Sequence, residues 1–203
     1  MARKSSKKSA AKSTSRPPSA SKRESSDRSA SKASPKTVKK PAKPVATNTA
    51  ILNEGDRAPD FTLQRDGEST VRLADYKGRK LVIFFYPRAD TPGCTTEAMA
   101  FTRLAKQFEA ADTGVLGISG DTVRQQTKFR DKHALAVPLG ADVELDTIKA
   151  YGVWGEKSMY GRAFMGIIRT TVLIGKDGRV ARIWRNVRVD GHAEEVLEAT
   201  RSL

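Results

Sequence analysis

The sequence has very few of the residues from which metal centres and cross-linked folds are built. Among 203 residues there is one cysteine, Cys94, and there are two histidines, His133 and His192. A single cysteine cannot form an internal disulfide, which argues against a disulfide-stabilised secreted scaffold. The histidines are far apart in the sequence and have no cysteine or carboxylate neighbours at ligand spacing. We therefore expect neither a metal site nor a disulfide framework.

Long apolar runs are also missing. No run of about 20 apolar residues could span a bilayer, and no apolar segment of about 7 to 15 residues follows the N-terminal charges as it would in a secretory signal. There is no glycine-rich loop for phosphate groups. These absences predict a soluble intracellular protein without membrane contact, in the cytoplasm, nucleoid or nucleus. Clustered lysines fit poorly with an organelle transit peptide.

Aromatic residues are absent from residues 1–48, and acidic residues nearly so. This segment has 14 Lys and Arg against Glu24 and Asp27, so it carries +12 of the net charge of +14. Its Ser, Ala, Lys and Pro cannot bury enough apolar surface to offset chain entropy, and we predict a disordered basic tail. With Ser34-Pro35-Lys36 it resembles linker-histone tails. DNA or RNA is therefore a candidate partner; a solubilising linker or a sorting signal is the alternative.

Residues 49–203 have the size of one domain with its own core. Residues 81–85 are apolar without alternation, which is typical of a strand covered on both faces. Strand and helix patterns alternate after it, and a turn at residues 176–179 joins two antiparallel strands. The pattern predicts an α/β domain with a mixed central sheet flanked by helices. The expected strands are 61–63, 71–73, 81–85, 115–119, 171–174 and 180–184, with a short apolar segment at 136–139. The expected helices are 95–111, about 122–133 and 145–151. A last helix has Ala193, Val196, Leu197 and Thr200 on one face.

Cys94 lies between the predicted strand 81–85 and the predicted helix 95–111. The start of a helix offers unpaired backbone N–H groups and the positive end of the helix dipole, and both favour a thiolate over a thiol. A lone cysteine is often an ordinary core residue. The prolines and the glycine of the turn before Cys94, Pro87, Pro92 and Gly93, favour a reactive thiol instead.

The turn contains the motif Pro87-x-x-x-Thr91-x-x-Cys94. This motif resembles the active-site signature of the peroxiredoxins, which are thiol-dependent peroxidases with a thioredoxin-like fold. Further segments resemble the Q-type branch, also called bacterioferritin comigratory protein, namely residues 84–87, 91–97, 151–157 and 166–171. The resemblance covers residues 51–203. It implies a thioredoxin-like fold and reduction of hydrogen peroxide and organic hydroperoxides without a metal or an organic cofactor.

The resemblance also implies roles for individual residues. Cys94 would be the nucleophile that becomes a sulfenic acid. Thr91 would bring its hydroxyl to the sulfur and the incoming oxygen, and Pro87 would limit water near the thiolate. Arg169 would add positive charge, although nothing in the sequence spacing brings it to Cys94. The supporting candidates are the backbone N–H groups near Gly93 and the side chain of Glu97, which has an ordinary alternative role in stabilising the helix start.

One position departs from the Q-type pattern. Many members have a second, resolving cysteine five residues after the first, and this chain has Met99 there. A sulfenic acid on Cys94 must then be reduced by an external thiol, such as thioredoxin or glutaredoxin with glutathione. A disulfide oxidoreductase is a weaker hypothesis because a Cys-x-x-Cys pair is absent. The alternative from another class is a nucleic-acid-associated protein that uses its basic tail, with the domain as a redox sensor or an inactive carrier.

Overall fold

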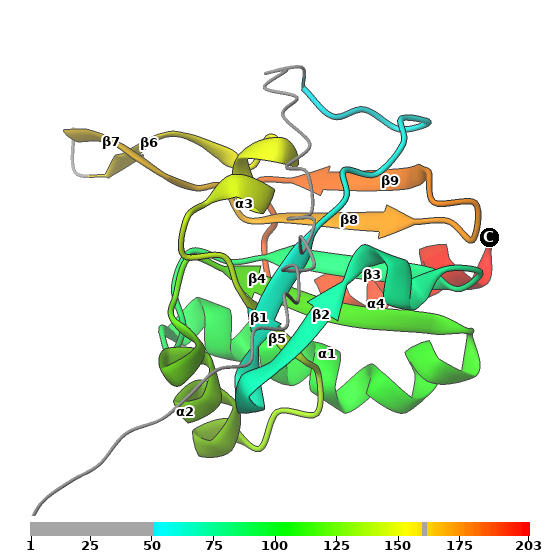
Figure 1. Cartoon of the computed structure of the whole chain (residues 1–203), viewed down its shortest axis with the longest axis horizontal. Helices are drawn as coiled ribbons and strands as arrows, with labels where there is room; N and C mark the ends of the chain where they lie inside the picture. The colour runs from blue at the N-terminus through cyan, green and yellow to red at the C-terminus, as the bar shows by residue number, and fades with distance from the viewer. Residues whose placement is uncertain (1–50, 160–161) are drawn as a thin grey trace, which may run out of the picture. The chain divides into compact units, whose positions relative to one another are not determined.

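The computed structural model describes residues 51–159 and 162–203 (Figure 1). Seven strands form one sheet: β1 (Thr62–Arg65), β2 (Ser69–Arg72), β3 (Lys80–Phe85), β4 (Thr113–Ser119), β5 (Leu139–Ala141), β8 (Thr170–Ile174) and β9 (Val180–Arg185). Their order is β2-β1-β5-β4-β3-β8-β9. β3, β4 and β5 run parallel, and the other pairings are antiparallel. The predicted mixed sheet is confirmed, whereas the predicted disordered tail, residues 1–48, lies outside the described residues.

β3 lies inside the sheet and contributes to the core on both faces. All six of its residues are buried. Leu81, Ile83 and Phe85 belong to the apolar cluster on one face, and Val82 and Phe84 belong to the cluster on the other. β3 pairs with β4 on one side and with β8 on the other. The prediction of a strand covered on both faces is therefore correct, and the end of β3 is held firmly where the Cys94 segment begins.

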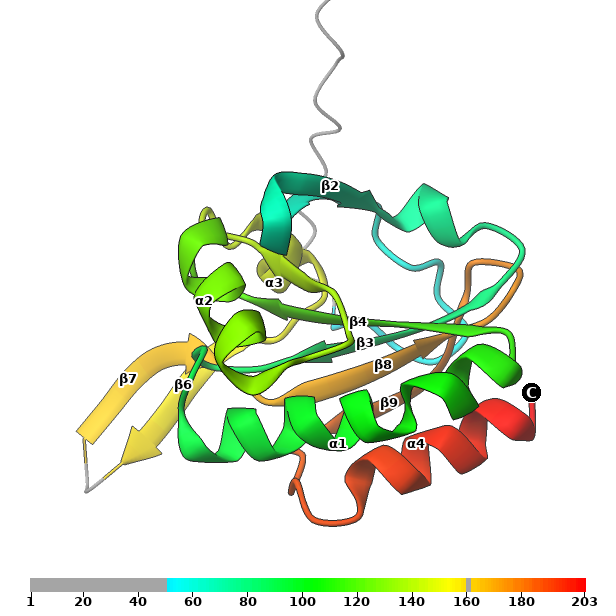
Figure 2. The ribbon, with the colours of Figure 1, turned by 90° about the horizontal axis from the view of Figure 1, so that it is seen from below.

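The described residues also form four α-helices and two short 3-10 helices: α1 (Pro92–Ala110), α2 (Val123–His133), α3 (Asp146–Ala150), α4 (His192–Arg201), η1 (Asp66–Glu68) and η2 (Leu73–Tyr76). Figure 2 shows α1 and α4 side by side along one face, with α3 on the opposite face. α4 buries Ala193, Val196, Leu197 and Thr200, which is the face that the sequence predicts. None of the helices in the two described ranges is long and apolar enough to cross a bilayer.

The structure corrects two predicted boundaries. α1 begins at Pro92, three residues before the predicted start at Thr95, with Thr91 as its N-cap residue. Proline is favourable at the first helical position because its fixed φ suits the helix and its missing N–H would have no partner there. Cys94 therefore lies inside the first turn of α1 and not in front of it. The apolar segment predicted at 136–139 forms strand β5 only from Leu139 onward.

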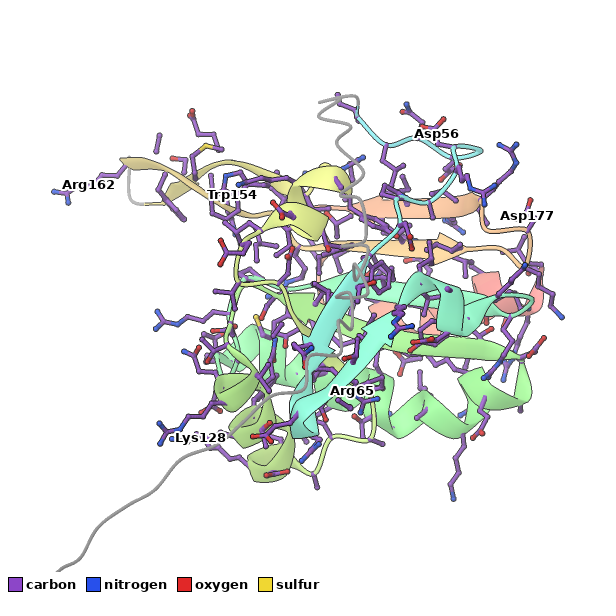
Figure 3. All side chains as sticks on the ribbon, in the orientation of Figure 1. Asp56, Arg65, Lys128, Trp154, Arg162 and Asp177 are labelled. Carbon is purple, nitrogen blue, oxygen red and sulfur yellow. The ribbon has the colours of Figure 1, made fainter. Side chains whose placement is uncertain are left out.

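A second, two-stranded sheet was not predicted from the sequence. It consists of β6 (Trp154–Met159) and β7 (Arg162–Ile167), which pair antiparallel with each other. The hairpin projects from the main body in Figures 1 and 2, and Figure 3 shows Arg162 at its outer part. The side chains of β7 are mostly exposed. Because neither strand buries a full apolar face, the alternation that reveals a half-buried strand is missing.

Candidate active site

Cys94 is held at the junction between β3 and α1. The backbone N–H of Tyr86 donates to the carbonyl of Ile118 at 3.1 Å and so extends the sheet contact past the end of β3. The chain then turns, and the N–H of Thr95 donates to the carbonyl of Thr91 at 2.8 Å as α1 begins. Cys94 is the third residue of this helix and is only 1% exposed. Its sulfur thus lies in the first turn of a long helix, at the positive end of the helix dipole, and is shielded from bulk water.

Arg169 reaches the sulfur from a segment 75 residues away in the sequence. Its Nη2 donates to Cys94 Sγ at 3.3 Å. The register of β8 explains this contact, because Thr170 pairs with Phe85 and places the preceding residue beside the end of β3. The N–H of Val187 donates to the Arg169 carbonyl at 3.0 Å and fixes the backbone there. The sheet therefore brings together a cation and a thiol that sequence spacing could not connect.

Glu97 is the third member of this cluster. It follows Cys94 by one helical turn, is 1% exposed, and its Oε2 accepts a hydrogen bond from Arg169 Nη1. Burial raises the pKa of the Glu97 carboxyl to about 7, against the opposing effect of the Arg169 charge. Glu97 Oε1 is buried and has no hydrogen-bond partner among the described residues. Glu97 is therefore not an ordinary solvent-exposed carboxylate at a helix start, because its side chain is buried and bound to Arg169.

Thr91, Pro87 and Gly93 belong to the turn and the helix start that carry Cys94, and none of them hydrogen-bonds its sulfur. Thr91 Oγ1 donates to the carbonyl of Arg88 at 3.0 Å, and no hydrogen bond joins it to Cys94. The expected contact between the Thr91 hydroxyl and the sulfur is therefore not formed in this structure. Pro87 is half-buried at the start of the turn. A Cβ at Gly93 would lie 3.5 Å from Arg169 Nη2, an ordinary contact distance, so no steric demand for glycine is visible.

A buried polar network lies next to the turn that carries Pro87 and Thr91, and the sequence analysis did not predict it. The hydroxyl of the fully buried Tyr86 donates to Gln126 Oε1, and Gln126 Nε2 donates to Ser119 Oγ at 2.8 Å. Ser119 Oγ donates to Asp121 Oδ2 at 2.7 Å, and the same carboxylate oxygen accepts from the N–H of Ala89 at 2.7 Å. The network thereby anchors the turn that carries Pro87 and Thr91. A glutamine on the buried face of a predicted helix was the one available sequence signal.

His192 is the first residue of α4 and is buried against the sheet strand that follows Arg169. It is 5% exposed, and its Nε2 lies 2.8 Å from Thr171 Oγ1. Burial lowers the pKa of His192 to about 4, so the ring is neutral at physiological pH. Within the described ranges no three His, Cys, Asp or Glu side chains gather as metal ligands. A cavity of about 620 Å³ lies at the far end of β3, around Leu81 and Ile174, and contains none of the candidate residues.

The chain is similar to known proteins over the whole of this region. Residues 54–183 match the AhpC/TSA family. Peroxiredoxin Bcp of Bacillus subtilis is 41% identical over 149 residues, which cover 73% of this chain and 95% of that protein. A putative peroxiredoxin of Mycobacterium tuberculosis is 40% identical over 150 residues, covering 74% of this chain and 96% of the relative.

Solved structures agree with the sequence matches. A cysteine-to-serine mutant of peroxiredoxin Q from Xylella fastidiosa has a TM-score of 0.72 at 38% identity, covering 75% of this chain and 98% of that one. The Xanthomonas campestris bacterioferritin comigratory protein, described for its alkyl peroxide reduction, has a TM-score of 0.69 at 38% identity, covering 75% of this chain and 98% of that one. The chain therefore belongs to the AhpC/TSA family as a peroxiredoxin of the Q (Bcp) type, with a thioredoxin-like fold and thiol-dependent peroxidase activity.

Proposed function

We propose that Cys94 is the residue that attacks the peroxide. The observation that carries this proposal is the position of Arg169, whose two terminal nitrogens bind the sulfur and the Glu97 carboxylate at once. The thiolate attacks one oxygen of the peroxide in line, the O–O bond breaks, and the other oxygen leaves as hydroxide or alkoxide. The product on the protein is a Cys94 sulfenic acid. Its formation requires the site to supply both an ionised sulfur and donors for the leaving oxygen.

The donors have the larger part of this task. A free thiol with a pKa of about 8.5 is ~3% ionised at pH 7, so complete ionisation raises the rate by about 30-fold at most. Each further tenfold gain requires ~1.4 kcal/mol of stabilisation that is specific to the transition state. Arg169 and the N–H groups at the start of α1 can donate to the leaving oxygen. Thr91 can accept from the peroxide O–H with a free lone pair, and the half-buried Pro87 keeps water from the sulfur.

We further infer the class of peroxide and of reductant. Hydrogen peroxide and organic hydroperoxides share the O–O bond that the site would cleave, and the similar Xanthomonas protein is described for alkyl peroxide reduction. Met99 is half-exposed on α1 and offers no thiol to Cys94. The electrons for recycling must then come from an external thiol, with thioredoxin or glutaredoxin and glutathione as the candidates. A reducing intracellular compartment, which supplies such thiols, is the location that we propose.

Peroxide turnover is expected to require an added thiol. With stoichiometric peroxide and no reductant, the protein should complete one turnover and stop, with a sulfenic acid on Cys94 that dimedone traps and mass spectrometry locates. Thioredoxin with its reductase, or glutaredoxin with glutathione, should restore steady turnover. Continued peroxide consumption in the absence of any thiol would contradict the proposed cycle.

We propose nucleic-acid contact as a separate property of residues 1–48. Family membership leaves the inactive-carrier alternative for the domain without support, but it does not account for a segment with a charge of +12. Lys and Arg bind phosphate groups without a folded motif, because neutralised phosphates release counterions. As a flexible coil the segment would have an r.m.s. span of ~40 Å, enough to lie on DNA beside the domain.

Weak, sequence-independent DNA binding at low salt is therefore expected. If about half of the 14 cations in residues 1–48 contact phosphates, the logarithm of affinity should fall against the logarithm of salt concentration with a slope of about −6. Fluorescence anisotropy with labelled duplexes of two unrelated sequences measures this slope. Deletion of residues 2–48 should abolish binding and leave peroxidase kinetics unchanged. Retained binding by the truncated protein would place the DNA site on the domain and refute the proposal.

A further inference from the structure

Glu97 Oε1 is a buried carboxyl oxygen without a hydrogen-bond partner among the described residues. Buried polar atoms in folded proteins almost always have a hydrogen-bond partner, so each exception calls for a physical explanation. Glu97 Oε1 is the one buried side-chain oxygen or nitrogen of the described residues that lacks a partner. It belongs to a carboxyl group whose other oxygen is bound to Arg169, and Arg169 also binds the Cys94 sulfur.

The charges in this cluster do not balance if both acids are ionised. A Cys94 thiolate and a Glu97 carboxylate would be two buried anions sharing one cation. An uncompensated buried charge is costly, and groups in this situation take up a proton instead. Among the described residues Arg169 is the only side chain that hydrogen-bonds either of them. His192, which approaches Arg169 from α4, is neutral because burial lowers its pKa to about 4, and it adds no second cation at neutral pH.

We propose that Cys94 and Glu97 share a single proton in the reduced enzyme, and that this proton neutralises the oxygen that leaves when peroxide oxidises Cys94. This inference rests on the proposed role of Cys94. While the sulfur is a thiolate the proton is on Glu97, so Arg169 faces one anion. After the reaction the sulfenic acid is neutral and Glu97 is ionised, so Arg169 again faces one anion. The buried charge therefore stays constant through the chemical step.

The step balances without a further reactant. Thiolate and hydroperoxide give sulfenic acid and an alkoxide, and the alkoxide plus the Glu97 proton gives the alcohol. In the return half of the cycle, one external thiol condenses with the sulfenic acid and water leaves. A second external thiol then cleaves the mixed disulfide, which restores the Cys94 thiolate, and its proton returns to Glu97. The pKa of Glu97, raised to about 7 by burial, lets the carboxyl both hold and release a proton near neutral pH.

A purely positional role for Glu97 makes a different prediction. In that role the carboxylate stays ionised and only holds the Arg169 guanidinium in place. A glutamine can hold Arg169 as well, since its amide oxygen accepts a hydrogen bond at the same place, but it has no proton to exchange. The variant Glu97→Gln therefore separates proton storage from positioning. Glu109→Gln is the matched control, because Glu109 is an exposed acid on the same helix.

The test counts protons during a single turnover near pH 7. Reduced protein is mixed with stoichiometric hydrogen peroxide in weak buffer with a pH-indicator dye, in a stopped-flow instrument. The wild type and Glu109→Gln should take up no net proton. Glu97→Gln should take up one proton per oxidised Cys94, because the hydroxide that leaves must obtain its proton from solution. Equal proton counts in the wild type and Glu97→Gln would overturn the shared proton.

A second measurement follows the thiolate directly by its ultraviolet absorbance. At neutral and acidic pH the wild type and Glu97→Gln should lose this absorbance at the same pH, since a protonated carboxyl and an amide are both neutral, whereas a permanently ionised Glu97 would disfavour the neighbouring thiolate in the wild type alone. A thiolate that persists to lower pH in Glu97→Gln than in the wild type would also overturn the proposal. The outcome is separable from failure of the proposed function. If peroxide forms no sulfenic acid on wild-type Cys94, the assigned nucleophile is wrong. If sulfenic acid forms while the proton counts agree, only the shared proton is wrong.

Discussion

Replacing Cys94 by serine is expected to abolish peroxide turnover. The hydroxyl is nearly the size of the thiol, so α1 and the core around it should remain folded, but it does not ionise near neutral pH and is a poor nucleophile. We expect the peroxide rate constant to fall by more than about a thousandfold, equivalent to about 4 kcal/mol of lost transition-state stabilisation. Peroxide consumption with excess thioredoxin and its reductase measures the rate, and thermal unfolding followed by circular dichroism verifies the fold.

Met99→Leu is the control for this variant. Met99 carries another sulfur on the same helix, is 50% exposed, and lies where many Q-type members have their resolving cysteine. Its replacement by leucine keeps the volume and removes the sulfur, so peroxide turnover should stay within about twofold of the wild type. Substantial thiol-dependent turnover by Cys94→Ser would show that the chemistry takes place elsewhere in the chain.

The sequence predicts those parts of the fold that depend on burial. β3 is apolar at every position after Lys80 and is covered on both faces, so its pattern identifies it. The hairpin β6–β7 was missed because exposed strands such as β7 have no buried face to create a pattern. The start of α1 was placed three residues late because Pro92 and Gly93 were interpreted as part of the turn, although proline also suits the first position of a helix.

In the candidate site, too, the sequence predicts some relations between residues and not others. Cys94 and Thr91 are three residues apart, so local sequence places both at the start of α1. The contact between Arg169 and Cys94 depends on the pairing of β8 with β3, which joins segments 75 residues apart, and only the family resemblance indicated it. The sequence shows that residue 97 is a glutamate, but it does not show that this side chain is buried. An acid in the first turns of a helix is ordinarily solvated, and its pairing with Arg169 appears only in three dimensions.

Replacing Arg169 by glutamine is expected to have the second-largest effect. The guanidinium binds Cys94 and Glu97 with separate nitrogens, and one amide cannot reproduce this fork of charged donors. Loss of one preorganised donor to a developing oxyanion typically costs about 100- to 1000-fold in rate. We expect a decrease of this size in the second-order rate constant for peroxide, measured by stopped-flow oxidation. A lysine at this position should recover only part of the rate, since a single ammonium group cannot bind both partners.

Arg169→Gln should also be less stable than the wild type, by an amount that depends on pH. Without Arg169 the buried Glu97 has no cation, so its pKa rises further above the value of an exposed glutamate. A raised carboxyl pKa means that the folded state binds more protons than the unfolded state, and stability then falls as pH rises. The stability deficit of Arg169→Gln against the wild type should therefore be larger at about pH 8 than at about pH 5. It should stay below the about 3–5 kcal/mol typical of an unpaired buried charge, because Glu97 can take up a proton.

Urea unfolding at both pH values tests this expectation. Arg103→Gln is the matched control, because Arg103 forms an ion pair with Glu194 in which both side chains are largely exposed. Such a pair contributes less than about 1 kcal/mol, so the control should show neither the rate loss nor the growing deficit. If Arg169→Gln reacts with peroxide as fast as the wild type, Arg169 has no role in the reaction. A stability deficit that does not grow with pH would show that Glu97 does not depend on Arg169 for its charge.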